Sequence, residues 1–288
     1  MKTIFLDVFD CPKEHAIYMI YILACIQHKS KHIMYCNCAK DMKHILQESG
    51  LAHTLCWTIP DQFDMHIVYN SYEQPQLWIP RVLEQLTMPQ LQWKDVLKLL
   101  PKHDFITDLN QRAIDPKKTV VAVCIPNLPA DHILWPSLTN CLTQIAETES
   151  FFLVLIKSPA QDTQLDLHAH HKRFTYTLNK ELSHIEMAQL LSAVDVFIGH
   201  VGEYEHIAAV LRKPMLLIAP KQQRNWFKQG CRSDYIKLFP LIHHFSNDIK
   251  HMYLQFTELI YNWNLNIKTE EDELKHYYTL LDEPIAVY

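Results

Sequence analysis

Glycine is scarce in this chain of 288 residues, which contains only four. Two of the four lie within the short stretch Gly199-His200-Val201-Gly202. Glycine is the residue that most readily accepts a positive φ or a close approach of another group to the backbone. We therefore expect a tight turn here whose backbone is closely approached, with a plain turn of an α/β sheet as the alternative.

Cysteine and histidine are present, but without the spacings that metal sites use. The eight cysteines are scattered, several of them inside apolar runs, and no Cys-x-x-Cys pair occurs; they are residues 11, 25, 36, 38, 56, 124, 141 and 231. We expect reduced, mostly buried thiols rather than a disulfide framework or a zinc site. The 18 histidines include no His-Glu-x-x-His pattern, and the densest group, His168-Ala-His170-His171, fits a solvated loop better than a metal site. No metal and no cofactor are predicted.

The chain also has no basic field and no long apolar run, and its first residues do not have the pattern expected of a secretory leader. Its net charge is −5 and no dense Lys/Arg cluster occurs, so nucleic acid is not an expected partner. The longest apolar run, Ala16–Ile26, is too short to span a bilayer and fits a core helix. The first ten residues, MKTIFLDVFD, contain two aspartates and no small-residue cleavage site, which favours a cytoplasmic location.

Two series of alternating strands and helices predict an α/β protein with parallel sheets and helices on both faces. In the first series, strands are expected at 2–8, 32–36, 53–58 and 65–69, and helices at 15–27, 39–48, 76–86 and 93–100. The pattern loosens over 88–118, where 108–118 is the best linker. We therefore expect an N-terminal domain over 1–115 and a C-terminal domain over 116–288.

The second series opens with strands at 119–125, 151–156 and 173–177 and a helix from Trp135 to about Ala146. Ser183-His184-Ile185-Glu186 has the Ser-x-x-Glu form of a capping box and predicts a helix to Ala193. Two further helices are expected at the end of the chain, over 246–263 and 269–281.

The stretch 194–219 predicts a strand, turn, helix and strand unit, with strands at 194–198 and 215–219 and a helix over 203–212. The start of that helix offers free N–H groups and a positive dipole end, which suit a phosphate. In open parallel sheets ligands bind beyond the carboxyl ends of the strands, which nominates the loops 8–15, 126–135, 157–162 and 199–206. A site in a cleft between the two domains follows.

The C-terminal half resembles glycosyltransferase family 9, the bacterial heptosyltransferases. TVVAVCIPNLPADHILWPSLTNCLTQIA (119–146) resembles the family's strand, loop, Trp-Pro and helix segment. The 183–198 segment resembles its leucine-rich helix and adjacent strand, and 200–214 resembles its Asp-Thr-Gly-x-x-His-x-Ala-Ala motif with a following Lys-Pro. The matching positions in that motif are Gly202, His206, Ala208, Ala209, Lys213 and Pro214. The resemblance implies a GT-B-like fold, in which two Rossmann-like domains face each other across a central cleft.

The resemblance further implies a metal-independent glycosyltransferase that moves a sugar, with heptose one candidate, from a nucleotide-diphosphate sugar to a saccharide or lipopolysaccharide-type acceptor. The donor site would comprise His200, Val201, Gly202, Glu203 and His206 at the helix start and the cations Lys157, Lys221 and Arg224. The base that deprotonates the acceptor would be a carboxylate of the first-domain turn, Glu14 or Asp10, with His15 third. A lipid-linked acceptor would add peripheral contact with the inner face of the membrane.

The sequence departs from the family motif at several positions. His200-Val201 stands where the family has Asp-Thr, one extra residue separates Gly202 from His206, and Ile133 replaces a basic residue. The first-domain turn also lacks the family's Gly-Asp. These departures leave open a GT-B-shaped binding or partner subunit without transfer activity, and a nucleotide-sugar epimerase is a weaker third alternative. For each predicted site residue a structural role is also open, such as helix capping or core packing for His206 and dipole complementarity for Glu14.

Overall fold

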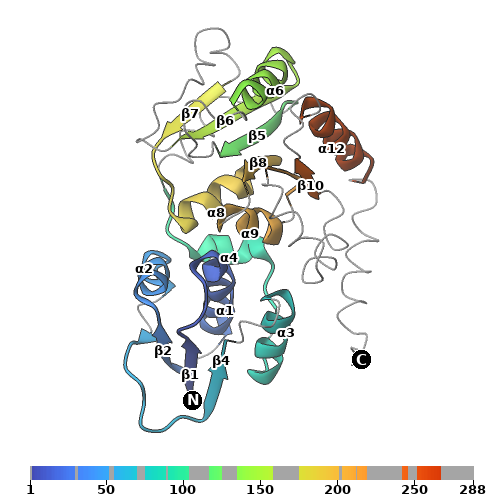
Figure 1. The fold of residues 1–288 in the computed structure, drawn as a ribbon. Coiled ribbons are helices and arrows are strands. Elements are labelled where there is room, and N and C mark those ends of the chain that lie inside the picture. The colour runs from blue at the N-terminus through green and yellow to red at the C-terminus, as the bar shows by residue number, and fades with distance from the viewer. Residues whose placement is uncertain are drawn as a thin grey trace.

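The computed structural model contains two parallel sheets, one above the other in Figure 1. It describes residues 2–29, 32–51, 55–69, 75–88, 90–103, 117–124, 135–157, 175–200, 203–211, 213–218, 242–245 and 252–266. The first sheet has the strand order β3-β2-β1-β4 and the second the order β10-β9-β8-β5-β6-β7. Every strand pair in both sheets is parallel. The expected α/β class with parallel sheets is confirmed.

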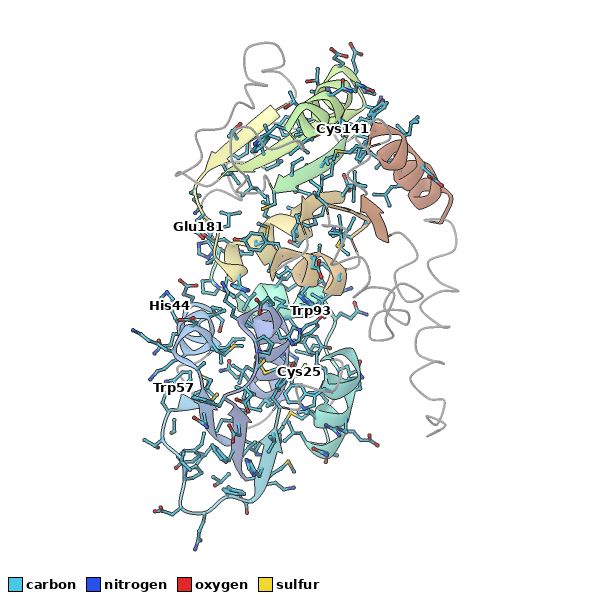
Figure 2. All side chains as sticks on the ribbon, in the orientation of Figure 1. Cys25, His44, Trp57, Trp93, Cys141 and Glu181 are labelled. Carbon is cyan, nitrogen blue, oxygen red and sulfur yellow. The ribbon has the colours of Figure 1, made fainter. Side chains whose placement is uncertain are left out.

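The first sheet consists of β1 (Thr3–Val8), β2 (Ile33–Cys38), β3 (Leu55–Cys56) and β4 (Met65–Val68). A 3-10 turn, η1 (Lys13–His15), leads into α1 (Ala16–Lys29), and α2 (Lys40–Glu48) follows β2. After β4 come α3 (Pro75–Gln85) and α4 (Trp93–Leu99). The helix α1 contacts α2, α3 and α4, and Figure 2 shows Trp93 of α4 at the end of this domain that adjoins the second one.

We expected helices on both faces of each sheet. For the described part of the first sheet this expectation is wrong. The connection from β3 to β4, residues 57–64, contains no helix, so this crossover covers the second face only with loop. Side chains on the α1 side, such as Leu6, are fully buried, whereas Val68 on the opposite side is 52% exposed.

The second sheet is built from β5 (Thr119–Cys124), β6 (Phe151–Lys157), β7 (Thr175–Asn179), β8 (Val196–His200), β9 (Met215–Ile218) and β10 (Ile242–Phe245). Its helices are α6 (Trp135–Glu147), α8 (His184–Ala193), α9 (Glu203–Val210) and α12 (Met252–Asn266). The strand β10 was not predicted from the sequence, and β7 as described extends two residues beyond the expected end at 177.

Both faces of the second sheet are covered, because alternate residues of its strands enter different cores. Val120 and Ala122 of β5 belong to a cluster with buried residues of α8 and α9, and this cluster continues into the first domain around α1. Val121 and Val123 belong to a second cluster with α6 and α12. The helices α8 and α9 therefore lie between the two sheets, as Figure 1 shows.

The capping box at the start of α8 is confirmed. The Ser183 hydroxyl accepts from the Glu186 N–H, and the Glu186 carboxylate accepts from the Ser183 N–H at 3.0 Å. The expected linker over 108–118, except its last two residues, and the helix over 269–281 lie outside the described residues, and the boundary at 115/116 stays a prediction.

Candidate functional site

Each sheet reverses its strand order at one point among the described strands. In the first sheet the order runs from β1 toward β2 and β3 on one side, and β4 lies on the other. In the second sheet β6 and β7 lie on one side of β5, and β8 and β9 lie on the other. Ligands of open α/β sheets bind beyond the carboxyl ends of the strands at such switch points. In this fold, the switch points lie at the carboxyl ends of β1 and β4 in the first sheet and of β5 and β8 in the second.

Tyr69 and His15 bridge the switch point of the first sheet. Tyr69 directly follows β4, and its hydroxyl lies 2.6 Å from Nδ1 of His15, which ends the loop after β1. That loop is closed by two backbone hydrogen bonds, from the Cys11 N–H to Val8 O at 3.0 Å and from the His15 N–H to Pro12 O at 2.9 Å. These contacts fix His15 at the carboxyl ends of both strands.

His206 brings the second sheet to the same place. It lies in the first turn of α9, the helix that follows β8. Its ring stands edge-on to the ring of His15, with centroids 4.9 Å apart and an interplanar angle of 79°. Its Nδ1 lies 3.4 Å from the hydroxyl of Tyr18 in α1. The loop after β1 and the helix after β8 therefore meet.

The helix α9 is buried over most of its surface. Glu205 is 1% exposed and His206 7%, and Ile207, Ala208 and Ala209 are fully buried. The strands β8 and β9, the helix α8 and the turn η1 all contact this helix. The Oε1 atom of Glu205 lies 3.9 Å from Nε2 of His206, so a buried carboxylate lies beside the buried imidazole.

The two predicted base candidates differ in exposure. Glu14, next to His15, is half-buried, whereas Asp10 is exposed. Of the two, Glu14 therefore lies nearer in the chain to the contact between His15 and His206.

The structure describes only the backbone at three other predicted positions: His200 ends β8, Glu203 begins α9 and Lys157 ends β6. Val201, Gly202, Lys221 and Arg224 lie outside the described residues. Tyr18 and Tyr69 were not predicted from the sequence as members of this contact. Tyr18 follows His15 at a spacing of three, which was the one available signal, since residues three apart share a helix face.

The expected turn beginning at Gly199 is corrected by the structure. Gly199 and His200 continue β8, and Gly199 does not have a positive φ. A Cβ atom at this position would lie 2.3 Å from Cζ and 2.7 Å from Cε1 of the buried Phe197 ring. The close approach inferred from the sequence is thus made by a side chain of the same strand.

Lys213 of the Lys-Pro motif supports the end of α8. Its ammonium donates to Val194 O at 2.7 Å and to Ser192 O at 3.4 Å, where the carbonyls of a helix end lack intrahelical partners. Burial lowers the pKa of Lys213, and the nearby Asp195 carboxylate partly opposes this shift. A cation at a helix C-terminus is favoured by the helix dipole, so this motif residue has a structural role.

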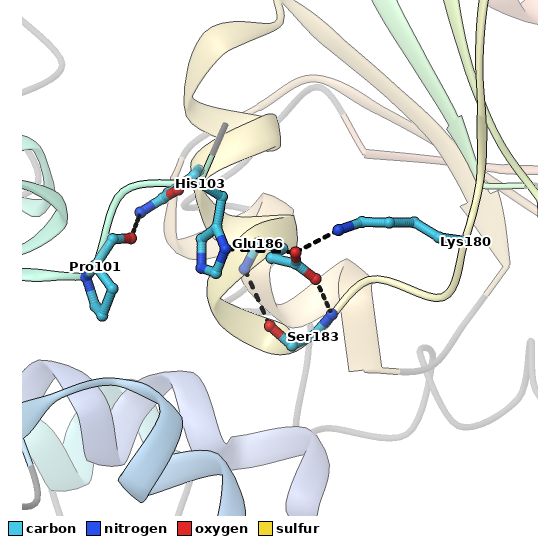
Figure 3. Close-up of polar contacts among 6 residues, drawn as sticks. Pro101, His103, Lys180, Ser183 and Glu186 are labelled. Atoms are coloured by element: carbon cyan, nitrogen blue, oxygen red, sulfur yellow. Dashed lines mark hydrogen bonds and ion pairs between the residues drawn. The ribbon is translucent and has the colours of Figure 1, made fainter. Parts of the chain in front are cut away.

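The segment after α4 is held against the start of α8, as Figure 3 shows. The Gln189 side chain donates to Pro101 O, and Nδ1 of His103 lies 3.4 Å from Oε1 of Glu186. Lys180 contacts the same carboxylate. Burial raises the pKa of Glu186, but the Lys180 and Ser183 hydrogen bonds outweigh it and leave the pKa below its usual value. These contacts attach residues 101–103 to the helix α8.

Two classes of feature are not found in the described part of the chain. No three His, Cys, Asp or Glu side chains there are grouped closely enough to hold a metal ion. Among the helices of the described ranges, none has the length and apolarity needed to cross a bilayer.

No family model matches the sequence, and no curated protein matches it either. Among solved structures the chain is similar to the glycosyltransferase of kitacinnamycin, at 9% identity over 90% of each chain with a TM-score of 0.49. It is similar to MnaA of S. aureus, solved with UDP, at 10% identity over 90% of this chain and 88% of that one, with a TM-score of 0.48. It is also similar to the heptosyltransferase WaaC of E. coli, solved with ADP, at 11% identity over 75% and 86%, with a TM-score of 0.46.

Proposed function

We propose that this protein is a glycosyltransferase that transfers a sugar from a nucleoside-diphosphate sugar to the hydroxyl of a saccharide acceptor. The observation that carries the proposal is the meeting of the two switch points through Tyr69, His15 and His206. Such a meeting lets one sheet present a donor and the other an acceptor at a shared point. The family 9 resemblance of residues 119–230 supplies the chemistry expected there.

The diphosphate of the donor would bind at the start of α9. Backbone N–H groups at a helix N-terminus attract phosphate, and Gly202 lets the backbone approach it closely. His200 and His206 would donate hydrogen bonds, with Val201 and Glu203 completing the turn. The cations Lys157, Lys221 and Arg224 would neutralise the leaving diphosphate, so that transfer requires no metal.

The acceptor would bind above the loop after β1. Glu14 would take the proton of the acceptor hydroxyl as that oxygen attacks the anomeric carbon, and the bond from this carbon to the diphosphate oxygen would break. Asp10 is the alternative base. Heptose as the sugar, a lipid-linked acceptor and a cytoplasmic location at the inner face of the membrane belong to the same proposal.

A second candidate function is a binding or partner subunit of the same shape without transfer activity. The burial of His206 between Tyr18 and His15 favours it, because a ring used for interdomain packing has less freedom to bind phosphate. The replacement of the family's Asp-Thr by His200-Val201 favours it too.

Calorimetric titration of the full chain with ADP, UDP, GDP and CDP tests the proposal. We expect one diphosphate to bind selectively in the micromolar range. His206→Ala should weaken that binding at least about tenfold, equivalent to roughly 1.4 kcal/mol. His44→Ala is the matched control, because the His44 side chain is 74% exposed on α2. A folded protein that binds none of the four would overturn the donor site and support the partner subunit.

A further inference from the structure

The face of the first sheet opposite α1 lacks the helix that its own crossover would ordinarily supply. The connections β1–β2 and β2–β3 run in one direction along the sheet, and β3–β4 runs back in the other. Right-handed crossovers that run in opposite directions pass over opposite faces, and parallel strands are usually joined by a helix. The β3–β4 crossover over 57–64 is loop, although sheets of parallel strands are normally covered on both faces.

Large apolar side chains are exposed on this uncovered side, which we call the open face. Val68 of β4 is 52% exposed and Ile33 of β2 is 37% exposed. Phe63, at the end of the crossover, is 43% exposed, and its ring centroid lies 5.6 Å from that of Phe5 and 5.1 Å from that of His66. These three side chains are of the kind that a covering helix would bury.

The strand register gives the size of the open face. Ile33 pairs with Thr3 and Val68 pairs with Asp7, on opposite sides of β1. Four residues along a strand and two strand spacings across the sheet separate Ile33 from Val68 by about 16 Å. That distance equals about 11 residues of α-helix, or three turns. The open face is therefore large enough for one helix of ordinary length.

The charge of the open face has one sign. Asp61 and Asp64 of the crossover are exposed, and Asp7 of β1 is partly exposed beside Asn37 and His66. No Lys or Arg occurs at the outward positions of the four described strands or within the crossover. A binding partner for this apolar and acidic surface would combine aliphatic side chains with cations.

We propose that the open face binds an amphipathic helix of a partner protein, with Lys or Arg flanking its apolar stripe. The aliphatic side chains of that helix would cover Ile33, Phe63 and Val68, and its cations would lie opposite the aspartates. A second copy docked through the same face would set aspartates against aspartates. An anionic lipid surface would repel them in the same way. The acidic charge therefore favours the basic helix over both alternatives.

Two synthetic peptides of 18 residues test the proposal with the full chain. Both have leucine at positions i, i+3, i+4 and i+7 of a helix, with lysine at the remaining positions in one peptide and glutamate in the other. In fluorescence anisotropy we expect the lysine peptide to bind at least about tenfold more tightly, and we expect high salt to reduce that ratio. Hydrogen exchange should show protection of residues 57–68 when the lysine peptide is bound.

Matched variants locate the binding surface. Val68→Ser should weaken binding of the lysine peptide at least about fivefold, because the apolar contact is lost. The Val68 carbonyl, which accepts from Trp78 Nε1, stays in place. Leu254→Ser is the control, since Leu254 is 59% exposed on α12 of the second domain. Asp61→Asn should also weaken binding, whereas Glu149→Gln, at an exposed carboxylate of the second domain, should not.

Three outcomes would overturn the proposal. One is equal affinity for the two peptides, and another is equal loss of binding in Val68→Ser and Leu254→Ser. The third is a different occupant, seen as a dimer in sedimentation or as binding to phosphatidylglycerol vesicles that Val68→Ser abolishes. The comparison of the peptides uses the wild-type chain and no nucleotide, so its failure is distinct from failure of the donor site.

Discussion

The imidazole of His206 stands edge-on against that of His15, with ring centroids 4.9 Å apart. One ring comes from the helix after β8 in the second sheet, and the other ends the loop after β1 in the first sheet. The hydroxyl of Tyr18 lies 3.4 Å from Nδ1 of His206, and the hydroxyl of Tyr69 lies 2.6 Å from Nδ1 of His15. These four aromatic side chains connect the switch points of the two sheets, beside which we propose the donor and acceptor sites.

The His15–His206 contact should contribute to the stability of the domain pair. Aromatic pairs of this geometry contribute about 0.5–1.5 kcal/mol beyond area burial. In a double-mutant cycle of His15→Ala and His206→Ala, followed by urea unfolding, we expect a coupling free energy in that range. Tyr18→Phe keeps the ring and removes only the hydroxyl, so it should cost less than His206→Ala. Additive effects of the two histidine substitutions would show that the rings do not interact in solution.

Glu14→Gln should reduce turnover while sparing donor binding, because the amide cannot accept the acceptor's proton. General-base catalysis contributes typically about 10²–10⁴-fold, so a loss of that size is expected in a transfer assay. Asp10→Asn, an exposed carboxylate of the same loop, should have a smaller effect. If both variants transfer at the wild-type rate, the base does not come from this loop.

Gly199→Ala should destabilise the protein by about 1–3 kcal/mol, the usual range for overpacking a core. The new methyl group would lie 2.3 Å from Cζ of Phe197, whose ring is fully buried, so either the ring or the backbone must shift. Thermal unfolding of the single variant and of Gly199→Ala with Phe197→Leu measures this. The shorter leucine should recover part of the loss, and a double variant as unstable as the sum of both changes would argue against the Phe197 clash.

Glu186→Gln should weaken the cluster that binds the segment after α4 to α8. Glutamine preserves the capping-box pattern but removes the charge that attracts Lys180 and His103, which should cost roughly 0.5–1 kcal/mol. The folded pKa of Glu186 lies below the ordinary value of 4.5, so its stabilisation is full above that value and is lost as the pH falls through the folded pKa.

Urea unfolding of wild type and variant across this acidic range measures the effect. The gap between the two proteins should be widest near neutral pH and should close in acid. A gap that does not change with pH would mean that the charge of Glu186 is not the cause.

Local patterns in the sequence predicted most elements of both sheets. The apolar runs that became β1, β5 and β6 are continuous because both faces of those strands are buried or partly buried, and such runs are easy to recognise. The Ser183 capping box was predicted correctly because capping depends on residues three positions apart. The strand β10 was missed because two of its four residues are histidines, and only pairing with β9 makes it a strand.

The site was predictable only in part. Parallel strands with helical crossovers place their carboxyl ends at one edge, so the loops after β1 and β8 could be nominated from the sequence alone. The contact of His15 with His206 could not, because it depends on how the two sheets pack together through α8 and α9. The reason for glycine at position 199 also depended on the tertiary structure, since a side chain there would clash with the Phe197 ring.

The sequence by itself thus determined the α/β class, the order of the elements and the loops that could carry chemistry, because these follow from local hydrophobic periodicity and chain polarity. The tertiary structure alone decided that the second face of the first sheet carries no helix in its β3–β4 crossover, that His206 packs against the first domain, and that Phe63 of that crossover lies against Phe5 of β1. Those features depend on contacts between residues distant in the chain, whose energies appear only once the sheets have formed and docked.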